Sequence, residues 1–263
     1  MRELYKNVGS RIHQLDARVK ITLTLAFIIF LNLTPFKAWP AYILFLTLII
    51  SVALYSRLSF GLVQKRSLMV LPFILAAVPL TFTRQLPYVL VPVFQGIEVP
   101  YSPEGIERFA SIAFKSWISV QAAIILAATS RFPDLMNALM QLRVPKIFIS
   151  IIGLMWRYLF LISEEVIRMM RARASRSATM PGSHPMSGSI FWRASVTGGM
   201  AGSLFLRSLE RSDRVYAAML SRGYNGELPA SEATALAGHD WWFLIIGIPV
   251  LAFLWILGML TGG

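Results

Sequence analysis

Two short arginine-centred stretches contain the residues of this sequence whose types and spacing suit them best to bind a partner. Residues 172–177 read Ala-Arg-Ala-Ser-Arg-Ser, and residues 218–224 read Ala-Met-Leu-Ser-Arg-Gly-Tyr. Each contains an arginine between two small residues, in the triplets Ser175-Arg176-Ser177 and Ser221-Arg222-Gly223. Small neighbours let a partner's backbone approach closely while the planar guanidinium forms paired hydrogen bonds to a carboxylate. The duplication therefore predicts two docking points for a soluble partner.

Helix electrostatics offer a second interpretation of these arginines. A cation near the C-terminus of a helix opposes the helix dipole and contributes about 0.3–1 kcal/mol. That effect accounts well for Arg168, Arg171 and Arg211, which lie in stretches rich in arginine. It accounts less well for Arg176 and Arg222, because it gives no role to the small residues on both sides. On the sequence alone, both interpretations of these two residues remain open.

The composition predicts an all-α membrane protein. Of the 263 residues, 56% are hydrophobic and only 14% are charged, which is outside the range of soluble globular domains. The net charge of +12 would suggest nucleic-acid binding in a soluble protein, but here most basic residues stand between hydrophobic segments. Because the sequence has no cysteine, it has no disulfide, thiol catalyst or thiolate metal site.

Five segments approach the roughly 20 apolar residues that a membrane-spanning helix needs. They are residues 19–33, 38–55, 68–82, 109–129 and 241–260. Loops rich in Lys and Arg are expected on the cytoplasmic side, which places the N-terminus, residues 56–67 and residues 131–239 there. The same rule places residues 83–108 outside. We therefore expect a multi-pass protein of the cell membrane with a cytoplasmic N-terminus.

The chain is expected to divide into three parts along its sequence. These are residues 1–130 with four spans, residues 131–239 with cytoplasmic or membrane-surface helices, and residues 240–263 with the last span. Residues 147–162 complicate this division, because they are apolar over a whole span's length except for Arg157. A central arginine costs about 2.5–3.5 kcal/mol on membrane insertion. We predict a helix packed at the membrane surface, and a helix that crosses the bilayer remains the alternative.

Two long helices are expected to carry the arginine stretches. The first covers residues 146–176 and the second roughly residues 191–220, with a Pro-Gly-Ser-His-Pro breaker at residues 181–185 between them. Gly223 is expected to cap the second helix at its C-terminus. Gly198 and Gly202 stand four residues apart, so they could let this helix cross another at close range.

Taken together, these features resemble the transmembrane (T) component of energy-coupling-factor transporters, close to the cobalt/nickel-type branch. Four stretches spread over nearly the whole chain carry the resemblance: residues 13–20, residues 157–158, residues 172–177 and residues 218–226. The first is similar to the family's LDPRxK opening, and the last is the most specific of the four. No one stretch is strong alone, and the resemblance depends on their order and on the membrane topology.

The resemblance implies a non-catalytic scaffold. In that family the T component joins a membrane substrate-binding subunit to two cytoplasmic ATPases, and the ATPases bind the ATP. Each of the two coupling helices ends in an arginine motif that lies in a groove of one ATPase. Arg176 and Arg222 would be the motif arginines here. The cargo implied by the branch is cobalt or nickel, and a vitamin remains an alternative because the scaffold need not contact the substrate.

The first arginine motif departs from the family's pattern. Ser175 and Ser177 stand where Ala and Gly are usual, which keeps close approach possible but leaves a glycine-type turn at Ser177 in doubt. Arg173 also stands between small residues, Ala172 and Ala174, and competes with Arg176 for the motif position.

Other chemistry is weakly represented. The three histidines, His13, His184 and His239, stand alone, so no metal site is expected within this chain. No GxxxxGK[ST] phosphate-binding loop is present, so the chain is not expected to be the ATPase. A membrane lipid or prenyl transferase is the alternative from another class, but the cytoplasmic carboxylates form no magnesium-binding cluster.

Charged residues at two places in the sequence have structural explanations. Glu164 and Glu165 are expected to pair with Arg168, which stands four and three residues later on the helix. Lys115 lies inside an apolar span, where its long side chain is expected to reach the membrane interface. A functional role for Lys115 is the alternative, because charges within membrane spans are often functional.

Overall fold

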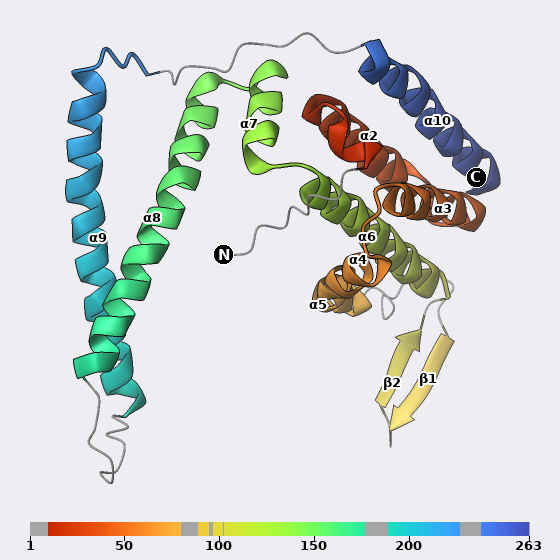
Figure 1. The fold of residues 1–263 in the computed structure, drawn as a ribbon. Helices are drawn as coiled ribbons and strands as arrows, with labels where there is room; N and C mark the ends of the chain where they lie inside the picture. Colours follow the sequence, from red (N-terminus) through yellow and green to blue (C-terminus); the bar gives the residue numbers. More distant parts are fainter. Residues whose placement is uncertain are drawn as a thin grey trace. The chain divides into compact units, whose positions relative to one another are not determined.

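The computed structural model describes residues 10–79, 89–94, 97–101, 103–176, 189–226 and 238–262. The described part is almost entirely helical (Figure 1), and the chain is an all-α membrane protein, as predicted. It divides into two compact units. The membrane unit comprises Arg2–Leu142 and Glu232–Gly263, and the hairpin unit comprises Arg143–Ser231.

The membrane unit is mainly helical. In the sequence, one part of it precedes the hairpin unit and the other follows it. Its helices are α1 (Arg11–Gln14), α2 (Ala17–Leu33), α3 (Trp39–Tyr55), α4 (Phe60–Ser67), η1 (Leu68–Val70), α5 (Leu71–Leu75), α6 (Pro103–Thr129), α7 (Phe132–Gln141) and α10 (Gly238–Gly262). A small antiparallel hairpin, β1 (Val89–Phe94) and β2 (Ile97–Tyr101), lies in the segment predicted as an external loop.

The core of the membrane unit lies between α2, α3, α6 and α10. Phe27, Phe45, Ile118 and Leu251 are buried there, one from each helix. The rings of Phe27 and Phe45 meet edge to face, with centroids 5.5 Å apart. This contact joins α2 and α3. The short break at residues 34–38 lies between these two helices and lets them fold back on one another.

Helix α10 packs closely because it carries glycine at its contact points. A β-carbon on Gly247 would lie 2.7 Å from Leu23 Cδ2 of α2. A β-carbon on Gly258 would lie 2.7 Å from Thr34 Cγ2 and 3.2 Å from the β-carbon of Ala41. Glycine at these positions therefore lets the last helix lie directly against the first two long helices.

Three described helices are long and apolar enough to cross a membrane: α6 over Glu104–Thr129, α8 (Lys146–Arg176) and α10. Helix α3 is apolar but shorter, at 17 residues. The predicted span over residues 68–82 differs from the structure, because residues 60–75 form three short helices. Pro72 lies at the start of α5, where its missing N–H costs least. Residues 80–82 lie outside the described part.

The hairpin unit contains two helices of equal length, α8 and α9 (Ile190–Leu220), each of 31 residues. They run in opposite directions, lie close together near the end of α8 and diverge toward its start (Figure 1). The bounds of α8 match the prediction, and α9 begins one residue earlier than expected. Ser189 caps α9, since its side chain accepts a hydrogen bond from the Trp192 amide at 3.3 Å. The predicted breaker at residues 181–185 lies outside the described residues.

Candidate docking site

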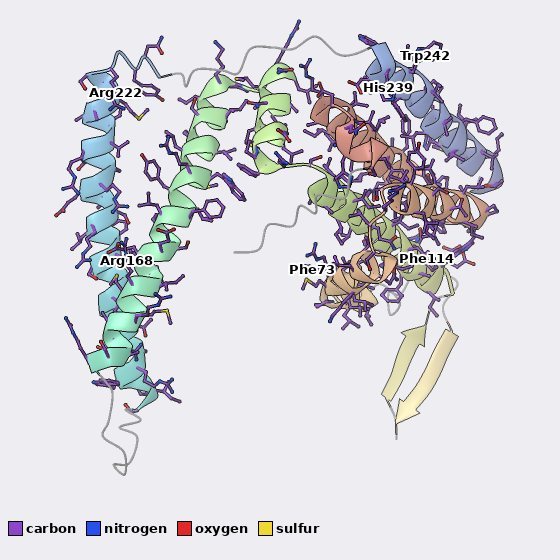
Figure 2. The ribbon with its side chains drawn as sticks, in the orientation of Figure 1. Phe73, Phe114, Arg168, Arg222, His239 and Trp242 are labelled. Atoms are coloured by element: carbon purple, nitrogen blue, oxygen red, sulfur yellow. The ribbon has the colours of Figure 1, made fainter. Side chains whose placement is uncertain are left out.

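The second arginine motif lies in a defined turn that ends α9. The Tyr224 amide donates to the Met219 carbonyl and the Gly223 amide to the Leu220 carbonyl, both at 3.0 Å. These two bonds form a Schellman motif, which requires a residue at positive φ. Gly223 has φ +82° and supplies it, so the predicted C-terminal cap is confirmed. Arg222 precedes this glycine in the turn directly after the helix (Figure 2).

The first motif lies at the end of α8. Arg176 is the last residue of the helix, and its side chain is exposed. The Ser175 hydroxyl donates to the Ala172 carbonyl at 2.9 Å, and the Ser221 hydroxyl of the other motif donates to the Ala218 carbonyl at 3.0 Å. Both serines are thus bonded to their own helix and do not engage the arginine beside them. Ser177 lies outside the described residues.

The guanidinium groups of Arg176 and Arg222 are both available to a partner. Each side chain is exposed, and within the described part of the chain neither makes an ion pair or a hydrogen bond. An arginine held at a helix end without a partner can present its full set of donors to a carboxylate. This availability distinguishes the two motif arginines from those that join the helices.

Arg173 has a different environment from Arg176. Its side chain is half-buried, and Nη1 donates to the Thr197 hydroxyl of α9 at 3.2 Å. The contact ties the two helices together near the end of α8. Of the two candidates for the first motif, Arg173 therefore faces the neighbouring helix and Arg176 is exposed.

Glu165 forms the second tie between the helices. Its carboxylate accepts from Arg168 at 2.6 Å and from Arg207 of α9 at 3.1 Å. Of the two pairings with Arg168 expected from the sequence, the one with Glu165 is confirmed, and Figure 2 shows Arg168 on α8. The pairing with Arg207 joins residues 42 apart, so helical spacing gave no signal of it.

The antiparallel arrangement places the two motifs at opposite ends of the hairpin. Arg176 is the last residue of α8, whereas Arg222 lies in the turn that follows Leu220, the last residue of α9, which runs the other way (Figure 2). A helix of 31 residues is about 46 Å long, since each residue adds about 1.5 Å. The two exposed arginines are therefore separated by roughly the length of the hairpin.

The opening stretch at residues 13–20 has a structural role in the membrane unit. Asp16 caps α2 by accepting from the Arg18 amide at 2.9 Å. The ammonium of Lys20 donates to the carbonyls of His13 and Thr129, both at 3.1 Å. Lys20 thereby holds the N-terminal segment and the end of α6 against α2.

Lys115 bonds to backbone atoms of the bundle. Its ammonium donates to the carbonyls of Thr34 at 2.6 Å and Asn32 at 3.1 Å, at the end of α2. The expectation that it only extends to the membrane interface was therefore incomplete, because these orphan carbonyls provide partners within the protein.

Two other features of the sequence, the histidines and the glycine pair of α9, form no site in the described part of the chain. Among the described residues no group of three or more His, Cys, Asp or Glu could hold a metal ion. His13 bonds Ser10 at 2.7 Å, and His184 lies outside the described part. A β-carbon on Gly198 or Gly202 would meet nothing within 4 Å, so the close helix crossing they could allow is not found there.

Comparison with known proteins gives a family and distant relatives. The family model described as "Cobalt transport protein" matches residues 9–235. An uncharacterized protein of Methanocaldococcus jannaschii, MJ1571, is 26% identical over 256 residues, which cover 96% of this chain and 84% of that protein. The cobalt transport protein CbiQ of Rhodobacter capsulatus is 26% identical over 127 residues, which cover 48% of this chain and 49% of that protein.

Proposed function

Since this chain belongs to the cobalt transport protein family, we propose that it is the energy-coupling scaffold of an ATP-driven importer. In this role it links two cytoplasmic ATPase subunits to a membrane subunit that binds the substrate. The chain is a transport component in this proposal and catalyses no reaction itself. The ATPase subunits bind and hydrolyse the ATP, and the scaffold needs no cofactor of its own.

The observation that carries the proposal is the placement of Arg176 and Arg222. Both are exposed, both lack a partner within the described residues, and they lie at opposite ends of one antiparallel hairpin. A single small docking protein would not contact both, because about 46 Å separates the ends of a helix of this length. Two ATPase subunits, one at each arginine, fit this separation.

The docking chemistry follows from the helix ends. A guanidinium donates two parallel hydrogen bonds to a carboxylate, and this pairing is strongest where water is excluded. At the second motif, Gly223 has no side chain, so the groove of an ATPase can approach the backbone beside Arg222. At the first motif, Ser175 and Ser177 are small enough for a similar approach. The assignment of Arg176 to the first motif is supported by the engagement of Arg173 with Thr197.

The hairpin can transmit movement because its helices are tied together. Glu165 bonds Arg207, and Arg173 bonds Thr197, so each tie joins α8 to α9. Displacement of one end by an ATPase therefore moves both helices. We propose that this movement reaches the substrate-binding subunit, and that the cargo is cobalt, which the family description names. Nickel is chemically close to cobalt and belongs to the same proposal.

The test is co-purification of the ATPase subunits from cells that co-express the neighbouring transporter genes. Arg176→Glu and Arg222→Glu should each weaken ATPase association, and the double change should abolish it, with membrane insertion intact. Arg214→Glu is the matched control, because Arg214 is an exposed arginine of α9 outside both motifs. A double variant that still binds the ATPases and transports cobalt normally would rule out this docking assignment.

A further inference from the structure

A groove of about 380 Å³ runs between α8 and α9 within the hairpin unit. We call it the hairpin groove. Its apolar wall consists of Leu154, Ile162, Leu204, Val215 and Met219. Its polar lining consists of Tyr158, Glu165, Arg207, Ser208, Arg211, Ser212, Tyr216 and Tyr224. The volume is within the range of roughly 300–1,000 Å³ that is typical of small-molecule sites.

The charge in the hairpin groove is unbalanced. Among the residues that line the groove, only Glu165 carries a carboxylate. This carboxylate already accepts hydrogen bonds from Arg168 and Arg207. Arg211 is half-buried, and within the described part of the chain it has no ion pair or hydrogen bond. Asp213 and Glu210 are exposed residues of α9 that do not line the groove. A half-buried guanidinium without a partner favours an anionic ligand.

The polar groups near Arg211 are also unengaged. The hydroxyls of Ser212, Tyr216 and Tyr224 make no hydrogen bond within the described residues. Together with Arg211 they can donate to several oxygens of one phosphate group. The apolar wall beside them needs a ligand that also carries a hydrocarbon part.

The groove adjoins an apolar surface. Ile147, Phe148, Ile151 and Met155 of α8 are each more than half exposed, and they precede or alternate with the groove residues Leu154 and Tyr158. An apolar helix face of this kind suits contact with lipid at a membrane surface. A ligand that reaches the groove across this face would carry a hydrocarbon part.

We propose that the hairpin groove binds an anionic membrane phospholipid. Its phosphate is held by Arg211 and the neighbouring hydroxyls, and an acyl chain lies along Leu154, Ile162 and Leu204. The bound lipid also contacts Met219 and Tyr224, the two residues joined by a hydrogen bond in the turn that presents Arg222. The inference does not depend on the proposed ATPase docking.

The test measures lipid binding to the full-length, delipidated chain in detergent, by native mass spectrometry during titration with phosphatidylglycerol or phosphatidylcholine. Arg211→Gln should weaken phosphatidylglycerol binding about tenfold, because it removes charged hydrogen bonds. Leu204→Trp should also weaken it, because the indole fills the apolar wall. Arg214→Gln, the matched control from the same helix, should bind as the unchanged protein does.

Three outcomes would overturn the proposal. One is equal binding of phosphatidylcholine, and another is an equal loss in Arg211→Gln and Arg214→Gln, which would reflect general charge attraction. The third outcome is that a helix of the membrane subunit, and not a lipid, occupies the hairpin groove. Because the chain lacks cysteine, Ser208→Cys allows a photoreactive group to be attached in the groove of the assembled transporter. Crosslinks to lipid support the proposal, and crosslinks to the membrane subunit alone contradict it.

Discussion

The ammonium of Lys115 in α6 lies 2.6 Å from the carbonyl oxygen of Thr34, the residue that caps the C-terminus of α2. The opposite end of the same helix pair has a matching contact, in which Lys20 of α2 donates to Thr129, the last residue of α6. Each helix therefore supplies a lysine that satisfies the free carbonyls at the end of the other. The two bonds fix α2 and α6 at both ends.

Lys115→Met should lower the stability of the membrane unit by about 1–3 kcal/mol, because the Thr34 carbonyl loses a charged donor in a poorly solvated place. Thermal unfolding of the full chain in detergent would measure the loss. Lys65→Met serves as the control, since Lys65 is exposed and has no bonded partner in the described part of the chain. Equal effects of the two substitutions would show that the contact with α2 contributes nothing specific.

Gly223→Val should weaken ATPase binding at the second motif more than Gly223→Asn. The backbone at this position has φ +82°, which costs a residue with a side chain about 1–2 kcal/mol and a β-branched residue more. Asparagine tolerates the conformation better. The space around Gly223 is open, so both effects reflect backbone strain. Affinity for the purified ATPase, measured by surface-immobilised binding, distinguishes the two variants, and equal affinities would contradict the prediction.

Arg173 and Arg176 should respond differently to removal of charge. Arg176→Gln is expected to reduce ATPase association while leaving the hairpin intact. Arg173→Gln is expected to loosen the hairpin, and its effect on stability should overlap with that of Thr197→Val in a double-mutant cycle, because the two side chains share a hydrogen bond. A cycle that couples Thr197 to Arg176 instead would reverse the assignment.

Gly258→Ala and Gly202→Ala should change stability in opposite directions. In α10 the new methyl group would lie 2.7 Å from Thr34 and 3.2 Å from Ala41, and such overpacking typically costs about 1–3 kcal/mol. In α9 the methyl group at position 202 meets nothing within 4 Å, so helix propensity should stabilise the variant by about 0.5–1 kcal/mol. Denaturation curves of both variants would check the signs. Destabilisation by Gly202→Ala would show that a partner helix covers this face.

Local signals made much of the hairpin unit predictable from the sequence. The end of α9 is marked by Gly223, because a glycine adopts the positive φ of a helix C-terminal turn without strain. The composition of α6 and α10 likewise predicted spanning helices, which the structure confirms by length and apolarity.

Contacts between distant residues were not predictable in the same way. The bond from Lys115 to Thr34 joins residues 81 apart, and the bond from Arg207 to Glu165 joins residues 42 apart. Neither contact corresponds to a periodic pattern in the sequence from which it could have been predicted. The short helices over residues 68–75 were predicted as part of one span because apolar composition does not show where a proline interrupts the hydrogen bonding.

The equal lengths of α8 and α9 have a consequence for how such transporters can vary. One residue added to either helix moves its terminal arginine about 1.5 Å along the axis and turns it about 100° around the axis. Even a single insertion would therefore point Arg176 or Arg222 away from the acceptor that the proposed docking requires. Seven added residues restore the direction but lengthen the hairpin by about 10 Å. If two ATPase subunits dock at these arginines as proposed, helix length sets the spacing between them, and the scaffold and its partners can change size only together.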